Sequence, residues 1–301
     1  MKLATAQLHG RTFIGLIMEE DKILDIQRAE KKLFEMATAP QSMIECIEMG
    51  EKFINHLKQL ELWVKKSDET ESYLYSISEV KWLAPVLYPR KNIFCVGKNY
   101  REHAMELGSE ADIPEDVMLF SKAPTTVIGH EETIDPHLHL TKELDYEGEL
   151  AVIIGKKGKM ISEEEAMDYV YGYTILNDIT ARDLQSRHKQ FLLGKSLDTS
   201  CPMGPYIVHK SAMEDPYALN VITKVNGDVR QNGHTKDMIF SIEKVISTIS
   251  QGTTLEPGDI IATGTPAGVG KGFKPPKYLM PGDVVEISID GLGTLTNKIG
   301  E

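Results

Sequence analysis

Cysteine is scarce in this sequence, and its three residues, Cys46, Cys95 and Cys201, include no CxxC pair. An odd number without such a pair predicts neither a disulfide framework nor a cysteine zinc site. No apolar run approaches the roughly 18 residues that a membrane span needs. The first nine residues also lack the continuous apolar segment of a signal peptide. We therefore expect a cytoplasmic protein with no membrane partner.

An excess of positive charge is also missing. The 301 residues include 33 basic and 45 acidic side chains, which gives a formal net charge of −12. Phosphate backbones are bound by clustered Lys and Arg, so this balance argues against nucleic acid as a partner. Hydrophobic residues make up 41% of the chain, which is enough for a core. The length suggests one large domain or two unequal ones.

The first part of the chain predicts a small α+β domain. Residues 11–17 and 23–27 alternate in polarity around a charged turn, as a hairpin does. Apolar residues recur at helical spacing from residue 42 to about 65. Pro85 and Pro89 then bracket a connector. We expect a small N-terminal domain over residues 1–88 and a larger domain over residues 89–301.

The larger part is richer in strands. A hairpin is predicted around Asn226-Gly227, because this pair supplies the positive φ angles of a type I′ turn. The late strands follow one another too closely for helical crossovers, which favours a β-rich α+β fold over a doubly wound sheet. The expected strands are 93–96, 150–154, 173–176, 221–225, 228–231, 260–263, 284–289 and 292–297; the expected helices are 100–107, 162–170 and 241–250.

Two carboxylates stand at the entrance of the most apolar strand. Glu147 and Glu149 are two residues apart, so on a strand they share one face. Like charges that enter a core repel each other, and each costs several kcal/mol to desolvate. A divalent cation between them would remove both costs. The alternative is a solvated strand end whose two acids face water.

A third acid could complete such a site. Asp178 follows the apolar strand 173–176, and three carboxylates without cysteine suit a hard cation such as Mg²⁺ or Mn²⁺. The competing interpretation is that Asp178 caps a helix. Asp183 would then be the acid of a capping box that begins at Thr180.

A possible general base lies on the helix 100–107. His103 and Glu106 are three residues apart and so share a face. A carboxylate beside an imidazole fixes its tautomer and raises its basicity. A surface ion pair at this spacing is the commoner occurrence, and the pattern alone leaves both open.

Two cations could balance the charge of the acids. Arg182 could hold a substrate carboxylate in a bidentate fork, and Lys195 could offset the acids near an anionic substrate. The loop 263–272 is rich in glycine but lacks the P-loop pattern, because Thr265 stands where its first glycine belongs. A backbone-lined loop that contacts a small anion stays possible there.

Five blocks in one order resemble the fumarylacetoacetate hydrolase family, over roughly residues 90–298. The resemblance implies a rolled mixed β-sheet with the site at its open end. It implies Mg²⁺ or Mn²⁺ held by Glu147, Glu149 and Asp178, with His103, Glu106 and Lys195 as catalytic residues. The substrate-binding candidates are Arg101, Arg182, Gln185, Gly264 and Thr265. The blocks are 95–106, 145–149, 177–185, 194–199 and 263–266.

The implied chemistry acts on a small 2-oxo acid. Its carboxylate and keto oxygens would chelate the cation, which stabilises an enolate. We expect cleavage of a C–C bond in a short β-keto 2-oxo acid, by acylpyruvate hydrolysis or by oxaloacetate decarboxylation to pyruvate. The alternatives are a 2-hydroxydienoate isomerase or hydratase of aromatic catabolism, and a metal-binding protein with a mainly regulatory role. Because a rolled sheet has edges to cover, we expect a homodimer.

Overall fold

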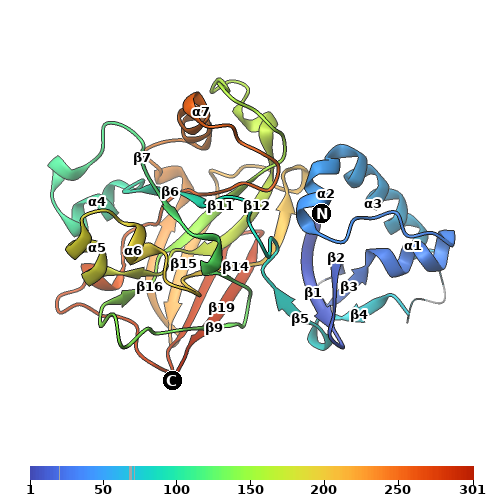
Figure 1. Ribbon diagram of the computed structural model, residues 1–301, viewed down its shortest axis with the longest axis horizontal. Coiled ribbons are helices and arrows are strands. Elements are labelled where there is room, and N and C mark those ends of the chain that lie inside the picture. The colour runs from blue at the N-terminus through green and yellow to red at the C-terminus, as the bar shows by residue number, and fades with distance from the viewer. Residues whose placement is uncertain (20, 68–69, 71) are drawn as a thin grey trace.

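A computed structural model describes residues 1–19, 21–67, 70 and 72–301 of the chain. Two lobes of unequal size lie side by side, and the smaller one contains the N-terminal strands and helices (Figure 1). Strands predominate in the larger lobe, which confirms the expected β-rich α+β fold. None of the described helices is long and apolar enough to cross a membrane.

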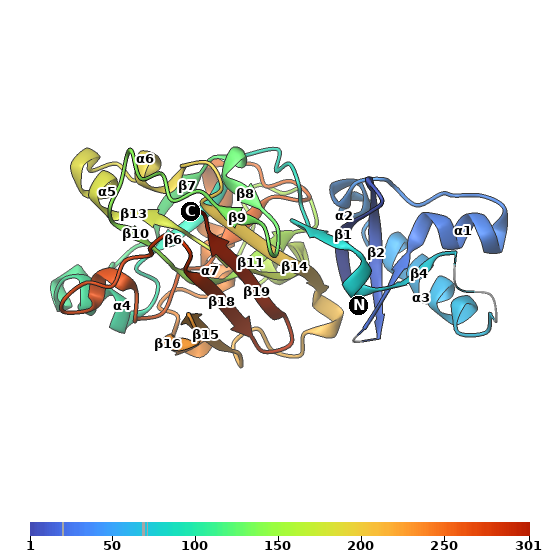
Figure 2. The same cartoon turned by 90° about the horizontal axis from the view of Figure 1, so that it is seen from below.

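The smaller lobe packs helices against a strand layer (Figure 2). The hairpin expected over residues 11–27 is present as the second and third strands. The helical spacing from residue 42 to about 65 corresponds to two helices, which Gly50, at φ 55° and ψ −133°, separates. The elements are β1 (Lys2–Leu8), β2 (Arg11–Glu19), β3 (Lys22–Asp25), α1 (Ile26–Phe34), α2 (Met43–Met49), α3 (Glu51–Val64), β4 (Leu74–Ser76) and β5 (Lys81–Leu83).

The larger lobe carries the remaining elements. Its strands are β6 (Ile93–Gly97), β7 (Met118–Lys122), β8 (Val127–Ile128), β9 (Thr133–Ile134), β10 (Leu144–Asp145), β11 (Gly148–Ile154), β12 (Val170–Asn177), β13 (Thr180–Ala181), β14 (Cys201–His209), β15 (Asn220–Val225), β16 (Asp228–His234), β17 (Ile260–Ala262), β18 (Val284–Ile289) and β19 (Gly293–Ile299). Its α-helices are α4 (Arg101–Leu107), α5 (Arg182–His188), α6 (Leu192–Lys195) and α7 (Ile242–Gly252).

One large sheet runs through both lobes. Its strand order is β4-β3-β2-β1-β14-β12-β11-β17-β6-β7, with β5 on β1 and β8 on β14. The lobes join where β1 pairs with β14, at Lys2 with Val208 and Leu3 with Ile207. A separate sheet has the order β16-β15-β18-β19-β9. The domain boundary near residue 88 stays a prediction, because hydrogen bonding is continuous between the lobes.

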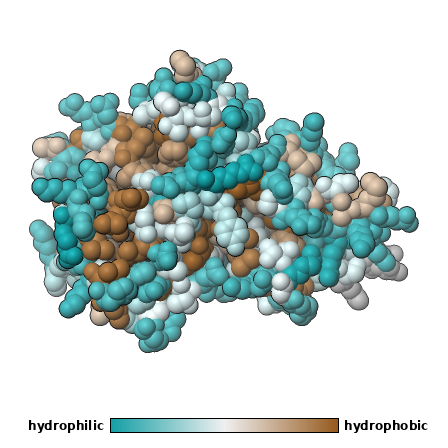
Figure 3. Space-filling model, in the orientation of Figure 1, coloured by the Kyte–Doolittle hydropathy of each residue, from teal (hydrophilic) through white to brown (hydrophobic). Residues whose placement is uncertain are grey.

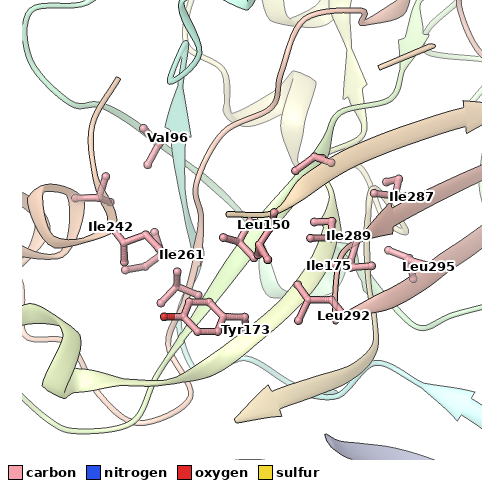
Figure 4. Close-up of a cluster of buried hydrophobic side chains, with 14 of the residues drawn as sticks. Val96, Leu150, Tyr173, Ile175, Ile242, Ile261, Ile287, Ile289, Leu292 and Leu295 are labelled. Carbon is pink, nitrogen blue, oxygen red and sulfur yellow. The ribbon is translucent and has the colours of Figure 1, made fainter. Parts of the chain in front are cut away.

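The main core lies where the two sheets of the larger lobe face each other (Figure 4). Leu150 and Ile175 come from β11 and β12, and Ile287 and Leu295 come from β18 and β19. All four are at most 1% exposed. This packing fixes the position of β11 and β12, and the ends of these two strands carry the predicted acids.

Two local predictions had opposite outcomes. The Asn226-Gly227 turn is confirmed, with φ angles of 52° and 83°. The helix expected over residues 162–170 is wrong, since only a 3-10 turn forms at Ala166–Tyr169. Val170 already belongs to β12 and pairs with Ile154. The sheet therefore takes the residues that a longer helix would need.

Candidate active site

Three acids meet at one end of the large sheet. Glu147 immediately precedes β11, Glu149 lies on it, and Asp178 follows β12. These strands are antiparallel, and Gly148 pairs with Asn177, so the start of one lies beside the end of the other. Carboxylate oxygens of the three acids lie within 4.8 Å of one another, and all three side chains are buried. Asp178 is therefore no helix cap. The N-cap of α5 is Ala181, without a side-chain hydrogen bond.

Two buried lysines contact this group. Lys195 Nζ lies 2.7 Å from Glu147 Oε2 and 2.6 Å from Asp178 Oδ2. Lys122 Nζ lies 2.8 Å from Asp178 Oδ1 and donates a hydrogen bond to the Ile179 carbonyl. The contact between Lys122 and Asp178 lacks hydrogen-bond geometry, which leaves Oδ1 without a donor. Sequence reasoning missed Lys122, because nothing in its local pattern separates it from a solvated strand end.

Among the described residues, the third acid, Glu149, has no cation within salt-bridge distance. Glu149 Oε2 accepts a hydrogen bond from the Gly264 N–H at 2.7 Å. Burial, together with the charges of Asp178 and Glu147, raises the pKa of Glu149 well above its usual value. Burial also opposes the charge of Glu147, but the cations Lys195 and Arg182 lower its pKa overall. A buried set of three oxygen donors with one strongly disfavoured charge fits a hard divalent cation.

Arg182 contacts one of the three acids, Glu147, and also Asp145. Its Nε donates to Asp145 Oδ2 at 2.8 Å, and its Nη2 lies 2.7 Å from Glu147 Oε1. Its Nη1 donates to Gln185 Oε1 at 3.3 Å. The guanidinium is 1% exposed and so is largely occupied by protein partners. The structure places Arg182 beside the acid Glu147, where it fixes that carboxylate.

A buried histidine and a partly buried acid form a pair on α4. His103 Nδ1 lies 2.8 Å from Glu106 Oε1. Glu106 also accepts the N–H of Gly268 through both carboxylate oxygens, at 3.2 and 2.9 Å. His103 is 5% exposed, which is unlike the surface ion pair considered above. Since Nδ1 is engaged by Glu106, Nε2 is the nitrogen left to act on a substrate.

The imidazole of His103 and the carboxylates of Glu147 and Glu149 line one pocket of about 390 Å³. Helices α4, α5 and α6 gather around it, at the end of the larger lobe away from the N-terminal helices (Figures 1 and 2). Apolar side chains contribute to its wall, and the larger lobe shows more hydrophobic surface than the smaller one in Figure 3. The predicted residues that line it are His103, Glu147, Glu149, Arg182, Gln185, Lys195 and Thr265.

Three of the substrate-binding candidates are engaged by other protein groups. Gly264 contributes its N–H to Glu149, as described above. Thr265 donates from Oγ1 to the Gly148 carbonyl at 2.9 Å, so its hydroxyl proton is used within the fold. Arg101 is exposed, pairs with Glu110 at 3.3 Å and lines a different hollow. The structure does not bring Arg101 to the acids.

Backbone amides of the glycine-rich loop 263–272 bind both Glu106, beside His103, and Asp145, beside Arg182. Gly268 binds Glu106, whereas the N–H groups of Gly270 and Lys271 donate to Asp145 at 2.6 and 3.0 Å. Asp145 in turn holds Arg182. The sequence showed an unusual glycine content here, but the carboxylates that these amides hold are distant along the chain.

Gly272→Ala is expected to lower turnover up to about 100-fold while the fold is retained. An added Cβ would collide with Oε2 of Glu106. That oxygen ends a flexible side chain, so Glu106 would shift and release His103, and small misplacements of this kind cost roughly that much. Circular dichroism and kcat would be measured together. Wild-type kcat in the variant would show that the position of Glu106 is immaterial.

Comparisons with known proteins identify the family of this chain. The family model described as "Fumarylacetoacetate (FAA) hydrolase C-terminal" matches residues 92–300. Oxaloacetate tautomerase YisK of Bacillus subtilis is 61% identical over 301 residues, which cover all of both chains.

Solved structures give the same result. Fumarylacetoacetate hydrolase from Exiguobacterium antarcticum is 40% identical, with a TM-score of 0.81, over 100% of this chain and 99% of that one. A 2-hydroxyhepta-2,4-diene-1,7-dioate isomerase from Mycobacterium marinum is 31% identical, with a TM-score of 0.75, over 100% and 98%. This chain belongs to the fumarylacetoacetate hydrolase family.

Proposed function

We propose that this protein is a divalent-metal-dependent enzyme that interconverts the keto and enol forms of oxaloacetate or a close 2-oxo acid. The observation that carries the proposal is the buried triad of Glu147, Glu149 and Asp178, because Glu147 and Glu149 line one pocket with His103, which contacts Glu106. The name of the Bacillus subtilis relative supports oxaloacetate and proton transfer over bond cleavage.

The three acids would hold Mg²⁺ or Mn²⁺, with Asp178 Oδ1 free of hydrogen-bond donors. When bound, such a cation polarises the keto oxygen of a chelated 2-oxo acid and stabilises the enolate. The all-oxygen donor set favours these hard cations over zinc.

The remaining residues divide the proton transfer between them. His103 Nε2 removes a proton from C3, and the electron pair of that C–H bond moves toward the C2 oxygen. Glu106 accepts the Nδ1 hydrogen bond and stabilises the imidazolium that results. Burial opposes the charge of Lys195, but Asp178 and Glu147 raise its pKa overall. Lys195 therefore stays an ammonium, which suits a proton donor to the C2 oxygen rather than a base.

The second candidate is the C–C cleavage expected from the sequence. It is favoured by the His103–Glu106 pair, which could activate a water molecule as well as a carbon acid. Hydrolysis would then cut an acylpyruvate, and loss of CO₂ would convert oxaloacetate to pyruvate.

One assay separates the two. Purified enzyme with Mg²⁺ or Mn²⁺ is mixed with enol oxaloacetate, and loss of the enol absorbance is followed together with pyruvate formation. We expect enol loss to be accelerated far more than pyruvate formation, and oxalate to inhibit it competitively because its two oxygens imitate a bound enolate. Pyruvate that forms as fast as the enol disappears would favour cleavage instead.

A further inference from the structure

The pocket is positively charged although the chain as a whole is acidic. Five cationic side chains and two carboxylates line it, in a molecule of net charge −12. The carboxylates are Glu147 and Glu149, which belong to the cation site. The cations are Lys98, Arg182, Lys189, Lys195 and Lys271. Because a lined cleft focuses its own field, this pocket should attract anions more strongly than the net charge suggests.

Among the described residues, three of the five cations already have carboxylate partners, whereas two do not. Lys195 and Arg182 contact the acids of the cation site. Lys98 pairs with Asp112 at 3.2 Å. Within the described part of the chain, no carboxylate oxygen lies within 4.0 Å of the Nζ of Lys189 or Lys271. Acids outnumber bases in this protein, so two unpaired lysines at one pocket suggest a ligand that supplies the missing charge.

Lys271 is held in place by its backbone. Its N–H donates to Asp145 Oδ2 at 3.0 Å, and the same oxygen accepts from Arg182 Nε. Arg182 contacts Glu147, so only Asp145 and Arg182 stand between the Lys271 backbone and the cation site. Its half-buried side chain runs toward α5, where Nζ lies 3.5 Å from Ser186 Oγ. Lys189 follows the end of the same helix.

We infer that Lys271, assisted by the charge of Lys189, binds the second carboxylate of a dicarboxylate substrate and so sets specificity for it. The inference rests on the proposed function, in which the 2-oxo acid end occupies the cation site. In oxaloacetate one CH₂ group separates the keto carbon from the second carboxylate, which must therefore point away from the cation. The pocket wall offers the ammonium groups of Lys189 and Lys271, which have no carboxylate partner among the described residues.

The test compares Lys271→Met with Lys274→Met. Both remove one charge from the same loop, but Lys274 is exposed and does not line the pocket. Met at position 271 keeps the N–H that binds Asp145. Deuterium exchange at C3 is measured for oxaloacetate and for the monocarboxylate 2-oxobutanoate. We expect Lys271→Met to raise KM for oxaloacetate about 10-fold, the worth of one charge-assisted hydrogen bond near solvent. Its kcat, the 2-oxobutanoate kinetics and the Lys274→Met enzyme should change little.

A binding measurement keeps the inference separate from the proposed function. Metal-loaded protein is titrated by calorimetry with oxalate and with 3,3-difluorooxaloacetate, which has no C3 proton to lose. Lys271→Met should weaken only the second ligand. This arm decides the inference even if wild-type enzyme fails to turn over oxaloacetate, a result that would overturn the proposed function alone. The role of Lys271 would be overturned if wild type and Lys271→Met bound 3,3-difluorooxaloacetate equally well. It would also be overturned if the variant lost the same affinity for both ligands.

Discussion

Glu149→Gln is expected to weaken Mg²⁺ or Mn²⁺ binding by at least about 100-fold, and activity should fall with it. Even residues that only orient metal ligands cost roughly 10- to 100-fold in affinity when they are changed. The substitution removes one of three charges but keeps the size of the side chain and an oxygen for the Gly264 N–H.

The same change should not destabilise the metal-free protein. Burial and its acidic neighbours raise the pKa of Glu149, so the charged form is disfavoured there, and a neutral amide relieves that repulsion. Calorimetric metal titration and thermal melting after chelation would be run on the variant and on Glu115→Gln, an exposed control. Wild-type metal affinity in Glu149→Gln would remove Glu149 from the ligand set.

His103→Ala should slow proton exchange at C3 of oxaloacetate by about 10²- to 10⁴-fold, the usual worth of a general base. Metal and oxalate binding should be unchanged, because neither uses the imidazole. Glu106→Gln should slow this exchange less than His103→Ala does. The substitution removes the charge of Glu106 but keeps a side chain of the same size to orient His103. Exposed His139→Ala is the matched control.

His103→Ala also distinguishes between acylpyruvate hydrolysis and oxaloacetate decarboxylation. Acylpyruvate hydrolysis requires a base to activate water, whereas decarboxylation requires only an electron sink. His103→Ala should therefore harm hydrolysis more than loss of CO₂ from oxaloacetate. Equal losses, with metal and oxalate still bound, would show that the imidazole serves every path.

Sequence reasoning found the site residues that belong to a local sequence pattern. Glu147 and Glu149 were recognisable because strand alternation sets them on one face before an apolar run. His103 and Glu106 followed from helical spacing. The structure brings His103 into contact with Glu106 and sets His103, Glu147 and Glu149 in the pocket wall.

The rest depended on contacts between distant segments. Lys122 is 56 residues from Asp178, and only the pairing of the sheet brings the two together. Arg182 was recognised as a site residue, but its hydrogen bond to Asp145 could be found only from the fold. The short turn before Val170 likewise reflects strand pairing that overrides helical periodicity. The homodimer and the cytoplasmic location stay predictions.

The most direct test of a metal-dependent proton transfer is enol oxaloacetate disappearance with chelator-treated protein, before and after metal is returned. Metal-free protein should match the uncatalysed rate, and a stoichiometric amount of Mn²⁺ or Mg²⁺ should restore turnover, with Zn²⁺ serving poorly. Free metal at the same concentration without protein is the control. Full turnover by the metal-free protein would contradict the assignment of Glu147, Glu149 and Asp178 to a catalytic cation.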